Sequence, residues 1–390
     1  MKALRHGRFY RSATRATATL ALVLSLLLPV VPASTASDTL PAEISDETFW
    51  KMIETFSEDG GSFTSENFSS NELGYQTLLP KLQSVVKPGG VYMGVGPEQN
   101  FQYIAGLKPK IAFIIDIRRQ NMLQHLMYKA AFEMSTNRAE FLSIIFSRPR
   151  PEGLTEASTT AQLFEAYENA VPNDAFVETN RKAIKDLLMK RHGFRLTEED
   201  EFTMDHVFDV FAAYGPTLNY SSNIDGLGRA APLRAGPNNV AYTELMIVVD
   251  DNGVNRSYLA SEESFRFVKE MEQKNLVIPI VGNFGGPKAI RAVAGYLKQH
   301  DAIVGAFYLS NVEQYLFRPP QGGGPIYAQF YQNVGTLPLD AYSTFIRSGN
   351  RQTGARGGLT PMMSSIQIIL DDFKGGMINQ QSDVIVRSTN

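Results

Sequence analysis

Residues 91–117 read VYMGVGPEQNFQYIAGLKPKIAFIIDI, and this stretch decides the fold. An apolar run over 91–95 ends in glycines, and Pro97 follows at a position typical of the first turn of a helix. The predicted helix continues to about Leu107, and a second apolar run covers 111–117. Strands that are apolar on both faces and alternate with helices are typical of a parallel sheet covered by helices. The stretch therefore predicts an α/β fold.

The same alternation of apolar strands and helices returns nearer the C-terminus. Residues 276–281 and 302–309 predict two further strands, and a helix near 361–373 follows them. Between the two halves, residues 137–213 have a helical pattern, and residues 214–239 form a loop rich in glycine and proline. A connection of that length is typical of a lid over a binding site. We therefore expect one mostly parallel sheet flanked by helices, with a helical insertion and a lid loop at about 137–239.

The first 36 residues predict an export signal. They carry five cationic side chains and no acidic one, with an apolar run over 17–31 and then the small residues Ser34-Thr35-Ala36. This order of features is typical of a secretory signal peptide. The apolar run has about 15 residues, fewer than the roughly 20 of a membrane-spanning helix. We therefore expect a periplasmic or secreted protein, with an uncleaved N-terminal membrane anchor as the alternative.

The composition excludes several classes of protein. The 24 Phe and 16 Tyr indicate a large folded core, and 37 Lys and Arg against 40 Asp and Glu disfavour a nucleic-acid partner. The absence of cysteine excludes disulfides and thiolate chemistry, and the histidines lack the spacing of a zinc site. No serine-hydrolase or phosphate-loop motif is present. We expect residues 37–86 to form an N-terminal helical segment and residues 87–390 the main domain, with no membrane contact beyond the signal.

The strongest candidate site combines Gly94, Gly96 and Asp116. Glycines at the end of a strand let a ligand approach the backbone, and the start of the following helix favours negative charge or polar acceptors. Asp116 ends the next strand, where an acid accepts hydrogen bonds from ribose hydroxyls in dinucleotide-binding folds. These residues predict a ligand site. In the alternative interpretation, the glycines only permit close helix packing and Asp116 pairs with Arg118 or Arg119.

Further polar residues follow the predicted strands. Because the carboxyl ends of parallel strands meet at one edge of a sheet, we expect these residues to lie together. The strand ends expected at that edge are marked by Gly96, Asp116, Asn283 and Ser310. Arginine offers forked donors for carboxylate or phosphate, so we expect a small polar or anionic ligand, with solvated or capped helix starts as the alternative. The candidate ligand-binding residues are Gly94, Gly96, Glu98, Gln99, Asn100, Asp116, Arg118, Arg119, Asn283, Asn311 and Glu313.

The strand, glycine and acid pattern of residues 88–134, and more loosely residues 260–316, resembles class I S-adenosylmethionine-dependent methyltransferases and Rossmann-like proteins in general. Gly94, Gly96 and Asp116 carry over from the family's motif, whereas Tyr92 stands in place of its acid and Glu98 in place of its third glycine. The resemblance implies a Rossmann-like fold and S-adenosylmethionine as a cofactor.

The chain also resembles an uncharacterised group of exported bacterial proteins that share the stretches GVGPEQN, DIRRQN and VNRSYLASEE, here residues 94–100, 116–121 and 254–263. Three functions follow from the sequence as hypotheses. The first is an exported Rossmann-like protein that binds a small ligand. The alternatives are a methyltransferase and a non-catalytic interaction protein, and the sequence leaves open whether any reaction is catalysed.

Overall fold

The computed structural model describes residues 38–63, 65–225, 230–231, 239–318, 324–349 and 359–389. The predicted signal peptide over residues 1–36 lies outside the described residues, as does part of the predicted lid loop. No helix in the described part of the chain is long and apolar enough to cross a membrane.

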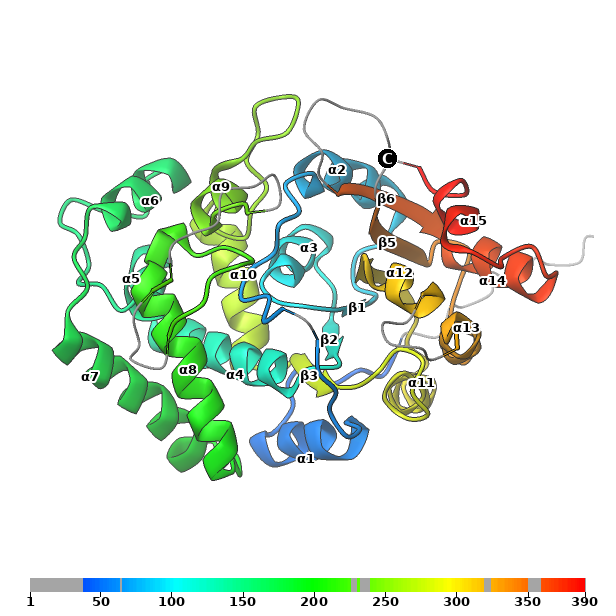
Figure 1. Ribbon diagram of the computed structural model, residues 1–390, viewed down its shortest axis with the longest axis horizontal. Helices are drawn as coiled ribbons and strands as arrows, with labels where there is room; N and C mark the ends of the chain where they lie inside the picture. The colour runs from blue at the N-terminus through cyan, green and yellow to red at the C-terminus, as the bar shows by residue number, and fades with distance from the viewer. Residues whose placement is uncertain are drawn as a thin grey trace, which may run out of the picture. The chain divides into compact units, whose positions relative to one another are not determined.

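The described strands form one six-stranded sheet in the order β3-β2-β1-β4-β5-β6. The first five strands in that order are parallel, and β6 runs antiparallel to β5. Strands β1, β2 and β3 are buried along their whole length, as expected for strands with helices on both faces (Figure 1). The strands are β1 (Val91–Gly94), β2 (Ile111–Asp116), β3 (Val277–Val281), β4 (Val304–Ser310), β5 (Thr344–Gly349) and β6 (Thr360–Ser365).

The four strands expected from the sequence are confirmed, and they lie next to one another. Strand β2 pairs with β1 and β3, and β1 also pairs with β4, each time in parallel. The sequence pattern does not predict β5 or β6. The helix expected near 361–373 is wrong over its first residues, because β6 continues to Ser365 and helix α14 (Ile366–Lys374) begins after it. Pro361 is compatible with β6 because this strand lies at the edge of the sheet.

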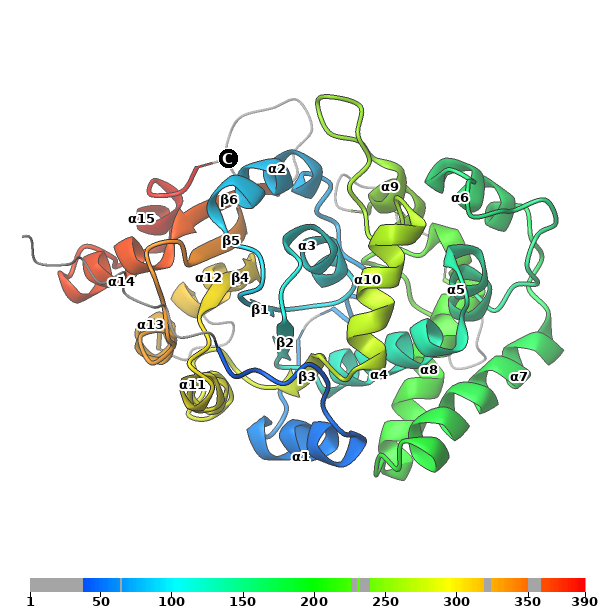
Figure 2. The same ribbon diagram turned by 180° about the vertical axis from the view of Figure 1, so that it is seen from behind.

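Helices cover both faces of the sheet (Figures 1 and 2). Helices α2, α3, α4 and α10 pack against one another on one face, and α1, α11 and α13 lie on the other. Their bounds are α2 (Tyr75–Val85), α3 (Gln99–Leu107), α4 (Arg119–Met134), α10 (Glu262–Gln273), α1 (Asp46–Phe56), α11 (Ala289–Gln299) and α13 (Tyr327–Val334). Near β4 to β6 lie α12 (Val312–Phe317), α14 and α15 (Gln381–Ile385).

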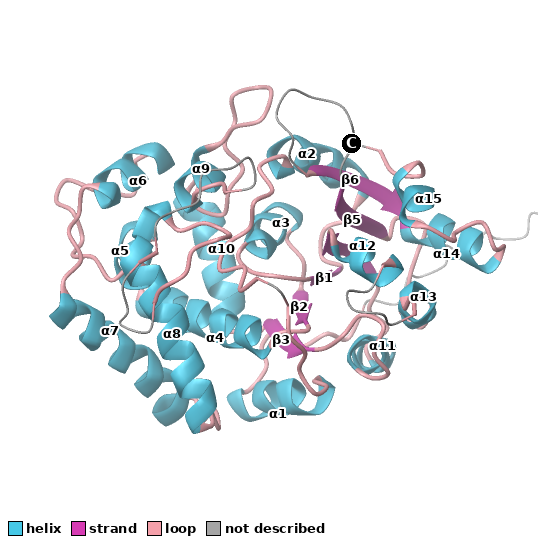
Figure 3. Cartoon of the chain, in the orientation of Figure 1, coloured by secondary structure: helices cyan, strands magenta, loops and turns pink. Residues whose placement is uncertain are grey.

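The described elements between β2 and β3 are all helices (Figure 3). Helix α8 packs against α4 and α7, and a capping box formed by Thr197 and Asp200 fixes its first turn. After α4, the elements of this stretch are α5 (Arg138–Ile145), α6 (Thr160–Glu168), α7 (Asp174–Lys185), the π-helix η1 (Asp186–Arg191), α8 (Glu198–Tyr214), the 3-10 helix η2 (Gly215–Thr217), α9 (Tyr242–Ile247) and α10.

Candidate functional site

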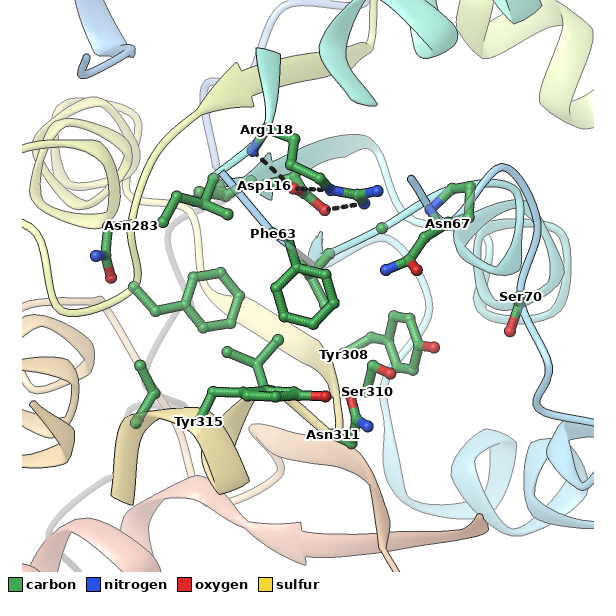
Figure 4. Close-up of a pocket in the computed structure, with 18 of the residues that line it drawn as sticks. Phe63, Asn67, Ser70, Asp116, Arg118, Asn283, Tyr308, Ser310, Asn311 and Tyr315 are labelled. Carbon is green, nitrogen blue, oxygen red and sulfur yellow. Dashed lines mark hydrogen bonds and ion pairs between the residues drawn. The ribbon is translucent and has the colours of Figure 1, made fainter. Parts of the chain in front are cut away.

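A cavity of about 340 Å³ lies at the carboxyl edge of the sheet (Figure 4). Residues at or just after the ends of four neighbouring strands line it: Gly96 after β1, Asp116 in β2, Asn283 after β3 and Ser310 in β4. The expectation that these strand ends meet at one edge is therefore confirmed. Their convergence follows from the parallel order of β3, β2, β1 and β4, which puts the four carboxyl ends side by side.

The loop between α1 and α2, of which residues 57–63 and 65–74 are described, forms a second wall of the cavity, and we call it the wall loop. Phe63, Asn67, Ser70 and Glu72 of this loop line the cavity, and Figure 4 shows Phe63 projecting into it. The Phe63 ring meets Tyr315 of α12 edge to face, with 5.0 Å between the ring centroids. The sequence does not predict this wall, because a loop rich in serine and asparagine has no signal that places it over a distant sheet.

The wall loop is tied to the sheet by hydrogen bonds. The Gly61 amide donates to the Ile117 carbonyl over 2.8 Å, and Gln124 of α4 donates to the Phe68 carbonyl over 2.7 Å. The Ser70 amide donates to Glu98 Oε1 over 2.9 Å. These bonds come from the ends of β1 and β2 and from the helices after them, so the loop and the strand edge form one structure.

Asp116 and Arg118 form a buried ion pair on the cavity wall (dashed lines in Figure 4). Asp116 Oδ1 accepts from the Arg118 amide and Nε over 2.9 and 3.0 Å, and Oδ2 accepts from Nη2 over 2.9 Å. Arg118 Nη1 also donates to the Glu66 carbonyl in the wall loop. The alternative interpretation, in which Asp116 pairs with Arg118, is therefore the arrangement in the structure, and both residues also face the cavity.

Gly94 and Gly96 are glycines for two different reasons. Gly96 lines the cavity at φ +77°, a backbone conformation that favours glycine. A Cβ added there would meet no atom within 4 Å, so the space next to Gly96 is open. A Cβ on Gly94 would lie 1.9 Å from Asn100 Oδ1. The space over Gly94 is therefore filled by protein and gives no ligand access.

Residues 98–100, expected at the ligand, are buried behind the cavity wall and do not line it. Asn100 Nδ2 donates to the carbonyls of Val95, Gly96 and Pro97 over 2.8–3.0 Å, and Tyr92 donates to its Oδ1. Glu98 holds the wall loop, and its burial raises the pKa of the carboxyl to about 8. Gln99 is buried in the first turn of α3. These side chains shape the turn after β1.

Two other candidates lie away from the cavity. Arg119 donates to both carboxylate oxygens of Asp200, the third residue of α8 and a member of its capping box, and so links α4 to the helical insertion. Glu313 is buried in a bidentate pair with Arg347 of β5. Asn283 and Asn311 do line the cavity, and Asn283 Oδ1 accepts from the Gly285 amide in the turn after β3.

Glu72 of the wall loop and Ser310 at the end of β4 contact each other in the wall of the cavity. Ser310 has φ +49°, a strained conformation for a residue with a side chain. Its Oγ donates to Glu72 Oε1, and Ser348 of β5 donates to Oε2. Burial raises the pKa of the Glu72 carboxyl, and the hydrogen bonds from Ser310 and Ser348 oppose this effect.

These features define an α/β protein with a pocket at the carboxyl edge of a mostly parallel sheet. The chain belongs to the family described as a domain of unknown function, DUF7790, which matches residues 67–206 and 238–363. The matched ranges contain β1 to β5 and the cavity residues Glu72, Gly96, Asp116, Asn283 and Ser310. No curated protein matches the chain.

Proposed function

We propose that this protein is an exported Rossmann-like domain that binds a small polar ligand in the cavity at the carboxyl edge of its sheet. One observation carries the proposal: four strand ends and a separate wall loop line one cavity of about 340 Å³. That volume lies within the range of small-molecule sites, and carboxyl-edge crevices are where open α/β sheets bind ligands. The strand order also matches the doubly wound order of Rossmann-like folds.

The lining suits a ligand with both polar and apolar parts. Asn67, Asn71 and Asn311 offer amide groups, while Phe63 and Phe284 offer apolar faces. A few polar groups in a largely apolar wall are typical of pockets that orient one small molecule. These residues support ligand binding without requiring a reaction.

The residues do not fit S-adenosylmethionine as the methyltransferase resemblance implies. A ribose diol would need two acceptor positions on Asp116, but three Arg118 donors already occupy this carboxylate, which has about four positions in all. Tyr92, in place of the motif's acid, is buried against Asn100. We therefore propose a ligand other than this cofactor.

Ser62→Trp tests the cavity as the binding site. Ser62 is exposed and lines the cavity, so an indole there should obstruct the site with little effect on stability. A library of neutral, cationic and anionic metabolites is screened by thermal shift, and calorimetry then measures affinity. We expect binding compounds to lose at least about tenfold in affinity in this variant, or about 1.4 kcal/mol.

The matched control is Ser84→Trp, on the exposed side of α2 and away from the cavity, which should leave affinity unchanged. Two results would contradict the proposal. One is that no compound of any charge binds, and the other is that the Ser62→Trp variant binds as tightly as the wild type.

Export is tested separately with a reporter fused after residue 45. The cationic start, the apolar run and the small residues at 34–36 support the expectation that the reporter appears outside the cytoplasm. Mass spectrometry of the mature protein should then find a new N-terminus near residue 37. A reporter that stays in the cytosol would contradict export and leave the ligand proposal standing.

A further inference from the structure

Glu72 is a buried acid in the cavity wall, with 1% of its surface exposed. Its carboxylate oxygens accept hydrogen bonds from Ser310 and Ser348, which are neutral donors. Within the part of the chain that the structure describes, no lysine, arginine or histidine forms an ion pair with it. A buried carboxyl without a counter-ion is costly to ionise, so a ligand that brings a positive charge would favour the carboxylate form of Glu72 and be held by it.

The charges of the lining point the same way. Among the described lining residues the charged groups are Glu72, Asp116 and Arg118. Arg118 is the cation of this set, and its guanidinium is already bonded twice to Asp116. An anionic ligand would therefore meet no unpaired cation and would lie near an unpaired acid. The charges of the lining therefore disfavour the anionic ligand that the sequence alone suggests.

Aromatic side chains supply the second half of a cation site. Phe63 lies near the middle of the view in Figure 4 with Tyr308 and Tyr315 beside it, and Phe284 and Tyr220 also line the cavity. The face of an aromatic ring attracts ammonium groups, most strongly where water is excluded. The loop after α1, strand β4 and helix α12 contribute Phe63, Tyr308 and Tyr315, so the arrangement of these three rings depends on the tertiary structure.

We propose that the cavity takes a small organic ammonium ion, with its charge beside Glu72 and its carbon groups against the aromatic rings. This inference rests on the proposed function, because it names the ligand class of the same cavity. Ser310 supports this arrangement. Its backbone has the strained φ of +49°, and in this conformation its Oγ donates a hydrogen bond to the Glu72 carboxylate.

The experiment compares molecules of one shape that differ in charge. Choline and 3,3-dimethylbutan-1-ol have matching shapes, but only choline is cationic, and benzylamine with benzyl alcohol makes a second pair. Binding to the full chain is measured by calorimetry and thermal shift, with benzoate as the anionic probe. We expect at least one ammonium ion to bind at least about tenfold more tightly than its neutral partner. Benzoate should bind more weakly than the neutral partner.

Glu72→Gln keeps the shape of the side chain and removes its charge. We expect this variant to fold, because it replaces a buried carboxyl that has no counter-ion with a neutral amide of similar size, and to lose the preference for the ammonium member of each pair. The matched control is Glu272→Gln, which removes a buried acid of α10 that does not line the cavity. That control should keep the preference.

Three results would overturn the inference. These are equal binding of charged and neutral partners to the wild type, tighter binding of benzoate, and an unchanged preference in the Glu72→Gln variant. If neutral compounds bind at least as tightly as the ammonium ions and Ser62→Trp blocks them, the cation inference fails and the cavity proposal stands. If no probe and no library compound binds, both fail. The wild-type comparison is decisive even if the variant is unstable.

Discussion

Replacing Arg347 with methionine should lower the free energy of unfolding by about 3–5 kcal/mol, because it leaves the Glu313 carboxylate buried without a counter-ion. Arg347 is 1% exposed, and its Nε donates to Glu313 Oε2 over 2.6 Å. Its Nη1 also donates to the hydroxyls of Ser364 and Ser388. One guanidinium thus joins β5, β6, α12 and the C-terminal segment. Denaturant unfolding followed by circular dichroism measures the change.

The double variant Glu313→Gln with Arg347→Met is the control for this result. Removing both charges takes away the unpaired ion, so we expect the double variant to recover a large part of the lost stability. A single Arg347→Met variant as stable as the wild type would show that the pair does not hold the C-terminal end of the sheet. The single and double variants should bind ligand with the same affinity, because neither Glu313 nor Arg347 lines the cavity.

Gly94→Ala should cost about 3 kcal/mol of stability, the second of the two largest effects. The new Cβ would lie 1.9 Å from Asn100 Oδ1 and 2.9 Å from the Tyr92 hydroxyl, so the buried amide must move. Asn100 cannot move freely, because its Nδ2 donates to three carbonyls of the turn after β1. The cost combines overpacking with the loss of buried hydrogen bonds. Thermal and denaturant unfolding check it.

Gly295→Ala is the matched substitution at a harmless position. Gly295 is exposed in α11, and a Cβ there would meet no atom within 4 Å. Alanine should stabilise the protein by about 0.5–1 kcal/mol, because glycine is a poor helix former. Equal effects of the two substitutions would contradict the account in which Gly94 is kept small by Asn100 rather than by a ligand.

The sequence was informative about the sheet wherever strands are apolar on both faces. Strands β1 to β4 are buried runs next to turn residues, so their pattern is visible in the sequence alone. Strand β5 contains Arg347, and β6 contains Pro361 and two serines, so neither has that pattern. Burial of Arg347 depends on Glu313 from another element, which no local pattern contains.

The candidate site residues likewise fall into those that the sequence places correctly at the cavity and those that it does not. Gly96, Asp116, Arg118, Asn283 and Asn311 line the cavity because they lie at or just after strand ends, and strand ends can be read from the sequence. The other candidates fail to reach it because neighbouring elements provide partners for them: Asn100 under Gly94, Arg119 at Asp200, Glu313 at Arg347.

The sequence by itself therefore determined the parallel core and the edge at which the strand ends meet, because apolar runs and strand direction are local properties. Only the tertiary structure decided the charge of the site. The sequence leaves open whether Asp116 pairs with Arg118, and it does not place Glu72 of the loop between α1 and α2 at the edge of the sheet. Whether a buried acid such as Glu72 has a counter-ion depends on which distant side chains meet it, and that information exists only once the chain has folded.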